Sequence, residues 1–171
     1  MPLRALPGAV SDHRPAAPAG AFEPRDPGYE ARVRASFARQ TVMKTFGASL
    51  VLVSPGAVDI ALPFRDDLCQ QHGFVHAGVV TTIADSACGY AALSLMPPDA
   101  AVLTVEFKVN LLAPARGDCL LARGRVTRPG RTLTVCQGEV VALADGVERP
   151  VATMLTTLMA IQDRPDVPAG L

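Results

Sequence analysis

The chain has 171 residues, 49% of them hydrophobic, and its 16 basic side chains balance its 16 acidic ones. These values predict one soluble domain with a hydrophobic core. A net charge of zero argues against a protein whose main task is to hold nucleic acid, because that task needs a surplus of Lys and Arg facing the phosphates.

The cysteines argue against two further classes of protein. They are widely spaced and form no CxxC pair, so neither a zinc site nor a disulfide scaffold is expected. We predict reduced thiols in a cytoplasmic protein for all four: Cys69, Cys88, Cys119 and Cys136.

The neutral sum hides an uneven distribution of charge. Residues 66–107 contain acidic residues but no Lys or Arg, whereas residues 1–65 and 108–171 each carry a surplus of basic residues. Such a distribution suits a protein that binds an anionic ligand with one part and acts on it with another.

The two ends of the chain differ from the middle. Residues 1–27 hold six of the 15 prolines and show no apolar periodicity. We predict flexible tails over 1–27 and 163–171, on either side of one domain over 28–162. The apolar run at the start is too short, and too soon broken by Pro7, for a secretory signal.

The first half of the domain predicts two helices with a strand pair between them. Tyr29, Val33 and Phe37 are four residues apart, which indicates an amphipathic helix. Strands over 50–53 and 58–62 flank a Pro-Gly turn. The Ala-rich segment 75–96 ends at Pro-Pro, which indicates a long helix. Its polar residues and the lack of flanking Lys or Arg argue against a membrane span.

The second half predicts long strands. In residues 101–111 apolar and polar side chains alternate, which is typical of a half-buried strand. Further strands follow over 119–127, 132–143 and 151–161, joined by hairpin turns. We therefore predict an α+β fold, in which a meander of antiparallel strands wraps around one central helix.

One carboxylate stands out on the central helix. Asp85 is the only formal charge between Asp67 and Asp99, and it lies on a polar stripe with Thr81 one turn before and Gly89 one turn after. A charge on a mostly buried helix needs a partner or a purpose. The alternative to a functional role is a hydrogen bond to strand backbone or hydroxyl groups that orients the helix.

The segment before this helix favours the functional role. Residues 70–78 hold two glutamines, two histidines and two glycines. Glycines at this point let a ligand approach the unpaired N–H groups of the first helical turn, which suit a developing oxyanion.

These residues resemble a known family. The run Gln-Gln-His-Gly-Phe-Val-His-Ala-Gly, then Asp85 after six more residues, and Thr-Val-Glu-Phe-Lys-Val-Asn-Leu-Leu-Ala-Pro-Ala at 104–115 are similar to the hotdog-fold acyl-CoA thioesterases of the phenylacetate-pathway (PaaI-like) branch. The resemblance covers about residues 40–160 by element order. It implies the hotdog fold and hydrolysis of an acyl-CoA to free acid and CoA.

The resemblance also implies roles for single residues. Asp85 would be the catalytic carboxylate, and the amide of Ala77 the oxyanion donor. His76 would support that turn, Gln70 would hold the water or the carbonyl, and Thr104 would orient the carboxylate. Ala77 stands where the family has the first glycine of His-Gly-Gly, but its amide remains available.

Three residues around the helix start are expected to contact the substrate: Gly78, Thr81 and His72. A loop imidazole such as that of His72 is more often structural. Strand alternation adds a contrary expectation for Thr104, because it places this side chain on the polar face, away from its own helix, unless the strand bends.

Helix geometry predicts a shared site. Asp85 follows Ala77 by eight residues, so the two lie about 12 Å apart along one helix and cannot reach the same carbonyl. If both act on one thioester, they come from different subunits, and the protein is a homodimer with paired sites. The hotdog family is built as such dimers, often paired again into tetramers.

Arginines are the second candidate feature. Five of them fall within residues 116–131, and the guanidinium fork suits the phosphates of CoA. A solvated outer sheet face is the alternative explanation. Arg128 and Arg131, beside the predicted turn, are the strongest candidates.

We therefore predict thioester hydrolysis, with Asp85 as general base or as nucleophile. No metal and no cofactor is expected, since the CoA thioester is the substrate, and neither nucleic acid nor membrane is a partner. The acyl group is expected in an apolar channel along the helix, beside Val79, Val80, Ile83, Tyr90 and Met96. A hotdog hydratase or dehydratase using His76 with Asp85, and a non-catalytic acyl-CoA binding module, stay open as alternatives.

Overall fold

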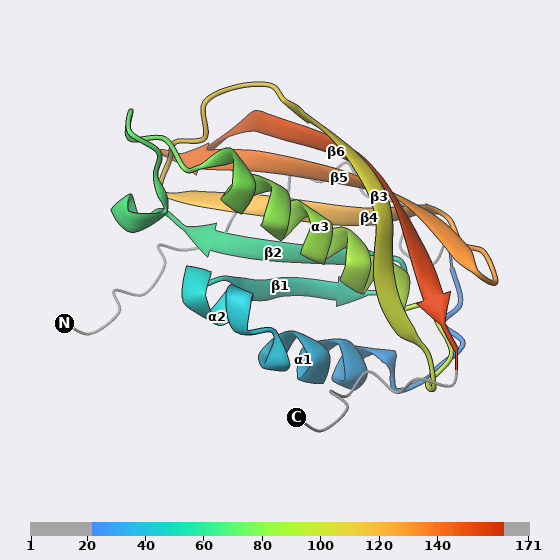
Figure 1. The fold of residues 1–171 in the computed structure, drawn as a ribbon. Helices are drawn as coiled ribbons and strands as arrows, with labels where there is room; N and C mark the ends of the chain where they lie inside the picture. The colour runs from blue at the N-terminus through green and yellow to red at the C-terminus, as the bar shows by residue number, and fades with distance from the viewer. Residues whose placement is uncertain (1–21, 163–171) are drawn as a thin grey trace.

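The structure, a computed structural model, describes residues 22–162. Its helices are α1 (Tyr29–Arg39), α2 (Thr41–Phe46), the short 3-10 helix η1 (Asp66–Leu68) and α3 (Ala77–Leu93). Its strands are β1 (Ser49–Ser54), β2 (Ala57–Pro63), β3 (Ala101–Leu111), β4 (Cys119–Arg128), β5 (Leu133–Ala144) and β6 (Val147–Ile161). The predicted α+β architecture, an antiparallel sheet around one long helix, is confirmed (Figure 1).

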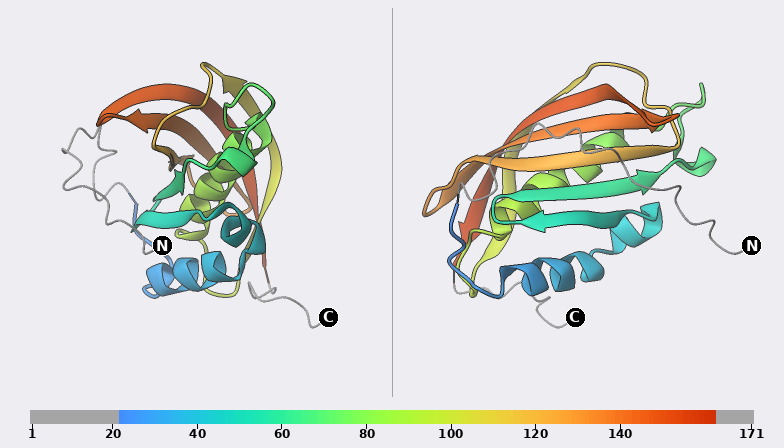
Figure 2. Two further views of the ribbon diagram at one scale, coloured as in Figure 1. Left: turned by 90° about the vertical axis from the view of Figure 1, so that its left-hand side faces the viewer. Right: turned by 180° about the vertical axis from the view of Figure 1, so that it is seen from behind.

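The strands form one antiparallel sheet in the order β1-β2-β4-β5-β6-β3. The predicted hairpins β1–β2, β4–β5 and β5–β6 are present. The predicted meander is wrong for β3, which pairs with β6 at the edge of the sheet. The reason is that β2 already occupies the side of β4 that β3 would need. The sheet curls around α3 as a result (Figure 2).

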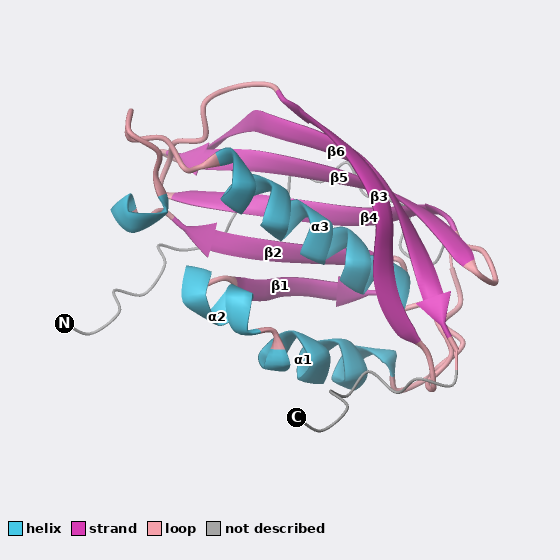
Figure 3. Cartoon of the chain, viewed as in Figure 1, coloured by secondary structure: helices cyan, strands magenta, loops and turns pink. Residues whose placement is uncertain are grey.

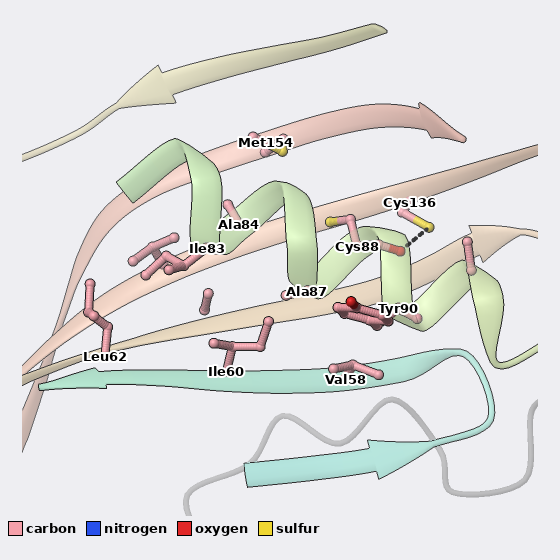
Figure 4. Close-up of a cluster of buried hydrophobic side chains, with 14 of the residues drawn as sticks. Val58, Ile60, Leu62, Ile83, Ala84, Ala87, Cys88, Tyr90, Cys136 and Met154 are labelled. Atoms are coloured by element: carbon pink, nitrogen blue, oxygen red, sulfur yellow. Dashed lines mark hydrogen bonds between the residues drawn. The ribbon is translucent and has the colours of Figure 1, made fainter. Parts of the chain in front are cut away.

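The core lies between α3 and the concave face of the sheet. Ile83 and Ala87 of α3 lie toward Val58 and Ile60 of β2, and Ala84 lies toward Met154 of β6 (Figure 4). Small side chains let the helix lie close to the strands, and a Cβ at position 124 of β4 would collide with the backbone of Ala87. No helix within residues 22–162 combines the length and the apolar character needed to cross a membrane.

This packing fills the place predicted for an acyl channel. The five side chains expected to line it are at most 9% exposed and belong to the core: Val79, Val80, Ile83, Tyr90 and Met96. Apolar residues on the sheet side of the helix therefore serve folding rather than an open channel.

The C-terminal end of α3 is held by Arg32 of α1. Its guanidinium donates to the carbonyls of Leu93 and Met96, at 3.0 and 2.8 Å, and pairs with Asp26 at 3.1 Å. A cation at this end also interacts favourably with the negative end of the helix dipole. Phe22 packs against the core as well. Residues 22–27, predicted to belong to a tail, are thus part of the packed structure; the rest of both predicted tails lies outside the described residues.

Several apolar side chains of β3 are more exposed than the sequence predicts. They were predicted to be half-buried by the sheet, yet Leu103, Val105, Phe107 and Leu111 are 51%, 52%, 45% and 54% exposed. Within residues 22–162, β3 pairs with β6 alone, so its other side offers free backbone groups. An exposed apolar edge strand of this length is a template for another chain.

Candidate active site

The N-terminus of α3 leaves one backbone donor unused. His76 is the N-cap, and its Nδ1 accepts the N–H of Gly78 at 2.9 Å. The N–H groups of Val79 and Val80 donate to the His76 carbonyl. The N–H of Ala77 has no acceptor among the described residues. The predicted oxyanion donor therefore has no acceptor within residues 22–162. The imidazole of His76 accepts the next N–H group, that of Gly78, and so supports the turn.

The cap predicts an effect on stability. His76→Ala should lower the free energy of unfolding by about 1 kcal/mol, because the Gly78 N–H loses its acceptor. His76→Asn should retain most of this stabilisation, since Asn is a favoured N-cap. Urea unfolding of both variants checks this, and equal losses would show that the imidazole ring itself, rather than the cap, stabilises the helix.

The loop before α3 is a tight turn. The backbone N–H of Gln70 donates to the Phe74 carbonyl at 2.8 Å, and Gly73 adopts a left-handed φ of 78°, which favours glycine. The side-chain oxygen of Gln70 accepts the backbone N–H of His72. This oxygen is thus engaged inside the loop, and the side-chain nitrogen of Gln70 is the atom left for a ligand. His72 is exposed at the tip.

Asp85 lies half-buried on α3 and accepts a hydrogen bond from the Thr104 hydroxyl at 2.8 Å. Burial raises the pKa of the Asp85 carboxyl, and the hydrogen bond from Thr104 opposes this shift. No ion pair involves Asp85 in the described part of the chain. A carboxylate held in this way is suited to take up a proton or to attack a carbonyl.

The contact between Thr104 and Asp85 corrects the expectation from strand alternation. Leu103, the neighbour of Thr104 on the same side of the irregularity after Thr104, is 51% exposed, so this part of β3 turns its apolar face outward and its polar face inward, the reverse of the expectation. Thr104 pairs with the fully buried Leu158 and faces the inside of the sheet. The hydroxyl thereby reaches the carboxylate, as the family resemblance implied.

The side of α3 that carries Asp85 is open. A Cβ at Gly89, one turn after Asp85, would meet no heavy atom within 4 Å. Glycine inside a helix costs about 1 kcal/mol relative to Ala. No contact within residues 22–162 requires glycine at this position, so the space suits a group from outside these residues. Thr81 lies one turn before Asp85, and its hydroxyl donates to the Ala77 carbonyl.

A further contact, made by the residue that follows Asp85, is not indicated by the sequence. Ser86 donates to the side-chain oxygen of Gln40, at the junction of α1 and α2, at 3.4 Å. No sequence signal marks Gln40, because the contact joins residues far apart in the chain. Residues 22–162 contain no group of three or more His, Cys, Asp or Glu that would hold a metal ion.

The free amide and the carboxylate do not form one site within a subunit. Both lie on α3, which runs without interruption through Ala77 and Asp85, so the distance along the axis is about 12 Å. A site shared between two subunits stays a prediction.

The five candidate arginines divide into two kinds. Arg123 pairs with Glu148 at 2.5 Å and Glu139 at 3.3 Å, and Arg125 pairs with Asp59 at 2.5 Å. These two have a structural explanation. Arg116, Arg128 and Arg131 make no ion pair with the described residues.

Arg128 and Arg131 lie at the far end of α3 from the oxyanion donor. Arg131 lies beside Met96, beyond the C-terminus of the helix. The 17 residues of α3 put this end about 25 Å from Ala77. The phosphate-binding role of Arg128 and Arg131 stays a prediction.

Comparison with known proteins decides the family. A family model described as the thioesterase superfamily matches residues 72–148. A solved thioesterase family protein from Silicibacter pomeroyi is 56% identical, with a TM-score of 0.78 over 79% of this chain and 99% of that chain. The chain belongs to the thioesterase superfamily. Thioester hydrolysis is the activity that this membership supports.

Other thioesterase-superfamily relatives agree. A protein of Halobacterium salinarum named as an esterase is 35% identical over 109 residues, 61% of this chain and 72% of that protein. The 1,4-dihydroxy-2-naphthoyl-CoA hydrolase of Listeria monocytogenes is 23% identical over 72% of this chain and 98% of its own length. The E. coli PaaI structure, 20% identical, has a TM-score of 0.70 over 78% of this chain and 93% of its own. The predicted hotdog fold is confirmed, and the likeness to PaaI holds at the level of fold.

Proposed function

We propose that this thioesterase hydrolyses an acyl-CoA at sites shared between two copies of the chain. The observation that carries the proposal is the N–H of Ala77 in the first turn of α3, which has no acceptor within residues 22–162, whereas the next three N–H groups have one. A half-buried carboxylate, Asp85, stands on the same helix at a distance that only a second copy can close.

The chemistry follows from these two groups. The thioester oxygen accepts the Ala77 N–H, and the positive end of the helix dipole stabilises the negative charge that develops there. Asp85 of the other subunit takes a proton from water, which attacks the carbonyl carbon. As the C–S bond breaks, the protonated carboxyl returns this proton to the sulfur, so CoA leaves as the thiol. In the second route Asp85 attacks directly, CoA leaves, and water hydrolyses the mixed anhydride. Thr104 orients the carboxylate in both routes.

The acyl group is proposed to lie along the open side of α3, beside Asp85 and Gly89. The absence of a side chain at Gly89 supports this, since no heavy atom of residues 22–162 lies within 4 Å of the place that a Cβ would take there. The CoA thioester in the name of the Listeria relative supports the carrier.

A dimer through β3 is proposed because its apolar side chains are exposed beside a free strand edge. Val105→Lys should give a monomer and abolish the shared site, because a charge on an edge strand opposes pairing with another chain. Val51→Lys is the matched control, since Val51 is 59% exposed on β1 at the opposite edge. Light scattering measures the molar mass of both variants. An intact dimer in Val105→Lys would show that the interface lies elsewhere than at β3. Pairing of dimers into tetramers remains a second expectation for the same experiment.

Thiol release from a panel of aryl-CoA and acyl-CoA thioesters tests the function directly. At least one member of the panel should be hydrolysed. Binding without hydrolysis of any member would instead favour the non-catalytic module. A hydratase is less well supported, because Nδ1 of His76 is occupied by the Gly78 amide. We also propose a cytoplasmic protein, supported by four free cysteines.

A further inference from the structure

A cleft of about 910 Å³ opens where three loops meet at the N-terminal end of α3. The loops precede α3, join β3 to β4, and join β5 to β6; they lie at the same end of the molecule (Figures 1 and 3). Two of its lining residues are candidates from the sequence: His72 as a substrate contact, and Arg116 as one of the five arginines within residues 116–131.

The cleft is lined by arginine side chains together with aromatic side chains. Arg116 and Arg149 are exposed and make no ion pair with any described residue. Phe64, Phe74 and His72 also line it. Unpaired guanidinium groups suit phosphates, and aromatic rings suit the flat face of a base.

Three carboxylates also line the cleft: Asp66, Asp118 and Asp145. Asp118 has a structural partner, since its Oδ2 accepts the backbone N–H of Asp145 at 3.4 Å. The cleft is therefore mixed in charge. This favours a ligand with both phosphates and hydrogen-bond donors, such as a nucleotide, over a bare anion.

The cleft lies close to the oxyanion donor. Phe74 precedes Ala77 by three residues, so the chain between them spans at most about 11 Å. The loop of Arg116 is tied to the same place, because the Ala115 carbonyl accepts the N–H of Val75 at 2.9 Å. Arg128 and Arg131 lie at the other end of the helix.

We propose that this cleft binds the nucleotide portion of the CoA carrier, with Arg116 and Arg149 on its phosphates and the rings of Phe74 and His72 against its base. The inference rests on the proposed acyl-CoA hydrolysis and adds the residues that recognise the carrier. Arg116 and Arg149 are binding residues, remote from the reacting atoms.

The test compares two substrates with one acyl group, carried on CoA or on pantetheine, which lacks the nucleotide. In Arg116→Ala/Arg149→Ala, the KM for the acyl-CoA should rise by about tenfold or more. Its kcat should stay the same, and the kinetics with acyl-pantetheine should not change. The control Arg34→Ala/Lys44→Ala removes the same charge from exposed positions of α1 and α2 and should change neither substrate.

Four results overturn the inference. An unchanged KM for the acyl-CoA, or equal changes for both substrates, would show that the cleft does not hold the nucleotide. A raised KM in Arg128→Ala/Arg131→Ala alone would move the phosphates to the other end of α3. If the wild-type protein hydrolyses neither substrate, the proposed function fails and the inference with it; if it hydrolyses both, only the inference is at stake. Thermal unfolding of each variant confirms that the fold is intact.

Discussion

Asp85→Asn is expected to lower kcat by roughly 10²- to 10⁴-fold while acyl-CoA still binds, because the carboxamide neither takes up a proton nor attacks the carbonyl. The shape and the hydrogen bond to Thr104 are largely conserved, so the fold should persist. Thiol release measures turnover, and calorimetry measures binding. Turnover at the wild-type rate would show that the carboxylate takes no part in the chemistry.

The same substitution should make the protein more stable at neutral pH. Burial raises the pKa of Asp85 in the folded state, so the folded state holds this proton more tightly than the unfolded state does. The contribution of this bound proton to the stability of the folded state is fully present below the ordinary pKa of Asp. It is lost as the pH rises through the raised pKa. Above that value the ionised carboxylate is a cost, which Asn removes. Unfolding curves of both proteins at neutral and acidic pH should converge toward low pH.

Ala77→Pro is the second large effect expected, a fall in kcat of about 10²- to 10³-fold. Proline is well suited to the first position of a helix, and the N–H it lacks has no acceptor in the described chain. His76 already has φ −59° and ψ 139°, the extended conformation that a residue before proline prefers. The variant should therefore fold normally and lose only the oxyanion donor.

Ala77→Gly is the control for this variant. It keeps the backbone N–H and removes one methyl group, so turnover should stay within a few-fold of the wild type. Circular dichroism and thermal unfolding check that both variants fold. If Ala77→Pro folds and retains full turnover, the amide of Ala77 is not the oxyanion donor.

Local patterns predicted the elements better than their arrangement. The Pro-Pro end of α3, the hairpin turns and the strand periods are encoded by neighbouring residues. The helix α2 and the turn η1 have only six and three residues, too few to show a period. The place of β3 beside β6 depends on contacts between distant segments. Alternation alone predicted these side chains to be half-buried, and the irregularity after Thr104 is not encoded in the pattern.

The candidate site shows the same division. Asp85 stands out in sequence because it is a lone charge on an apolar helix, and Ala77 because glycines and histidines surround it. Arg116 and Arg149 come from different loops and meet at one cleft only in the folded chain. Gln40 reaches Ser86 across a separation of 46 residues. Contacts between such distant residues produce no pattern in the local sequence.

The central claim is that two subunits build each site, one with Ala77 and the other with Asp85. Co-expression of Ala77→Pro and Asp85→Asn chains tests it most directly. Each variant alone should be nearly inactive. In a hybrid dimer the intact Ala77 of one chain faces the intact Asp85 of the other, so one of the two sites is complete. Random pairing should restore about a quarter of the wild-type turnover, since half of the dimers are hybrids. No recovery in purified hybrid dimers would show that each site is built within one chain, and it would contradict the account.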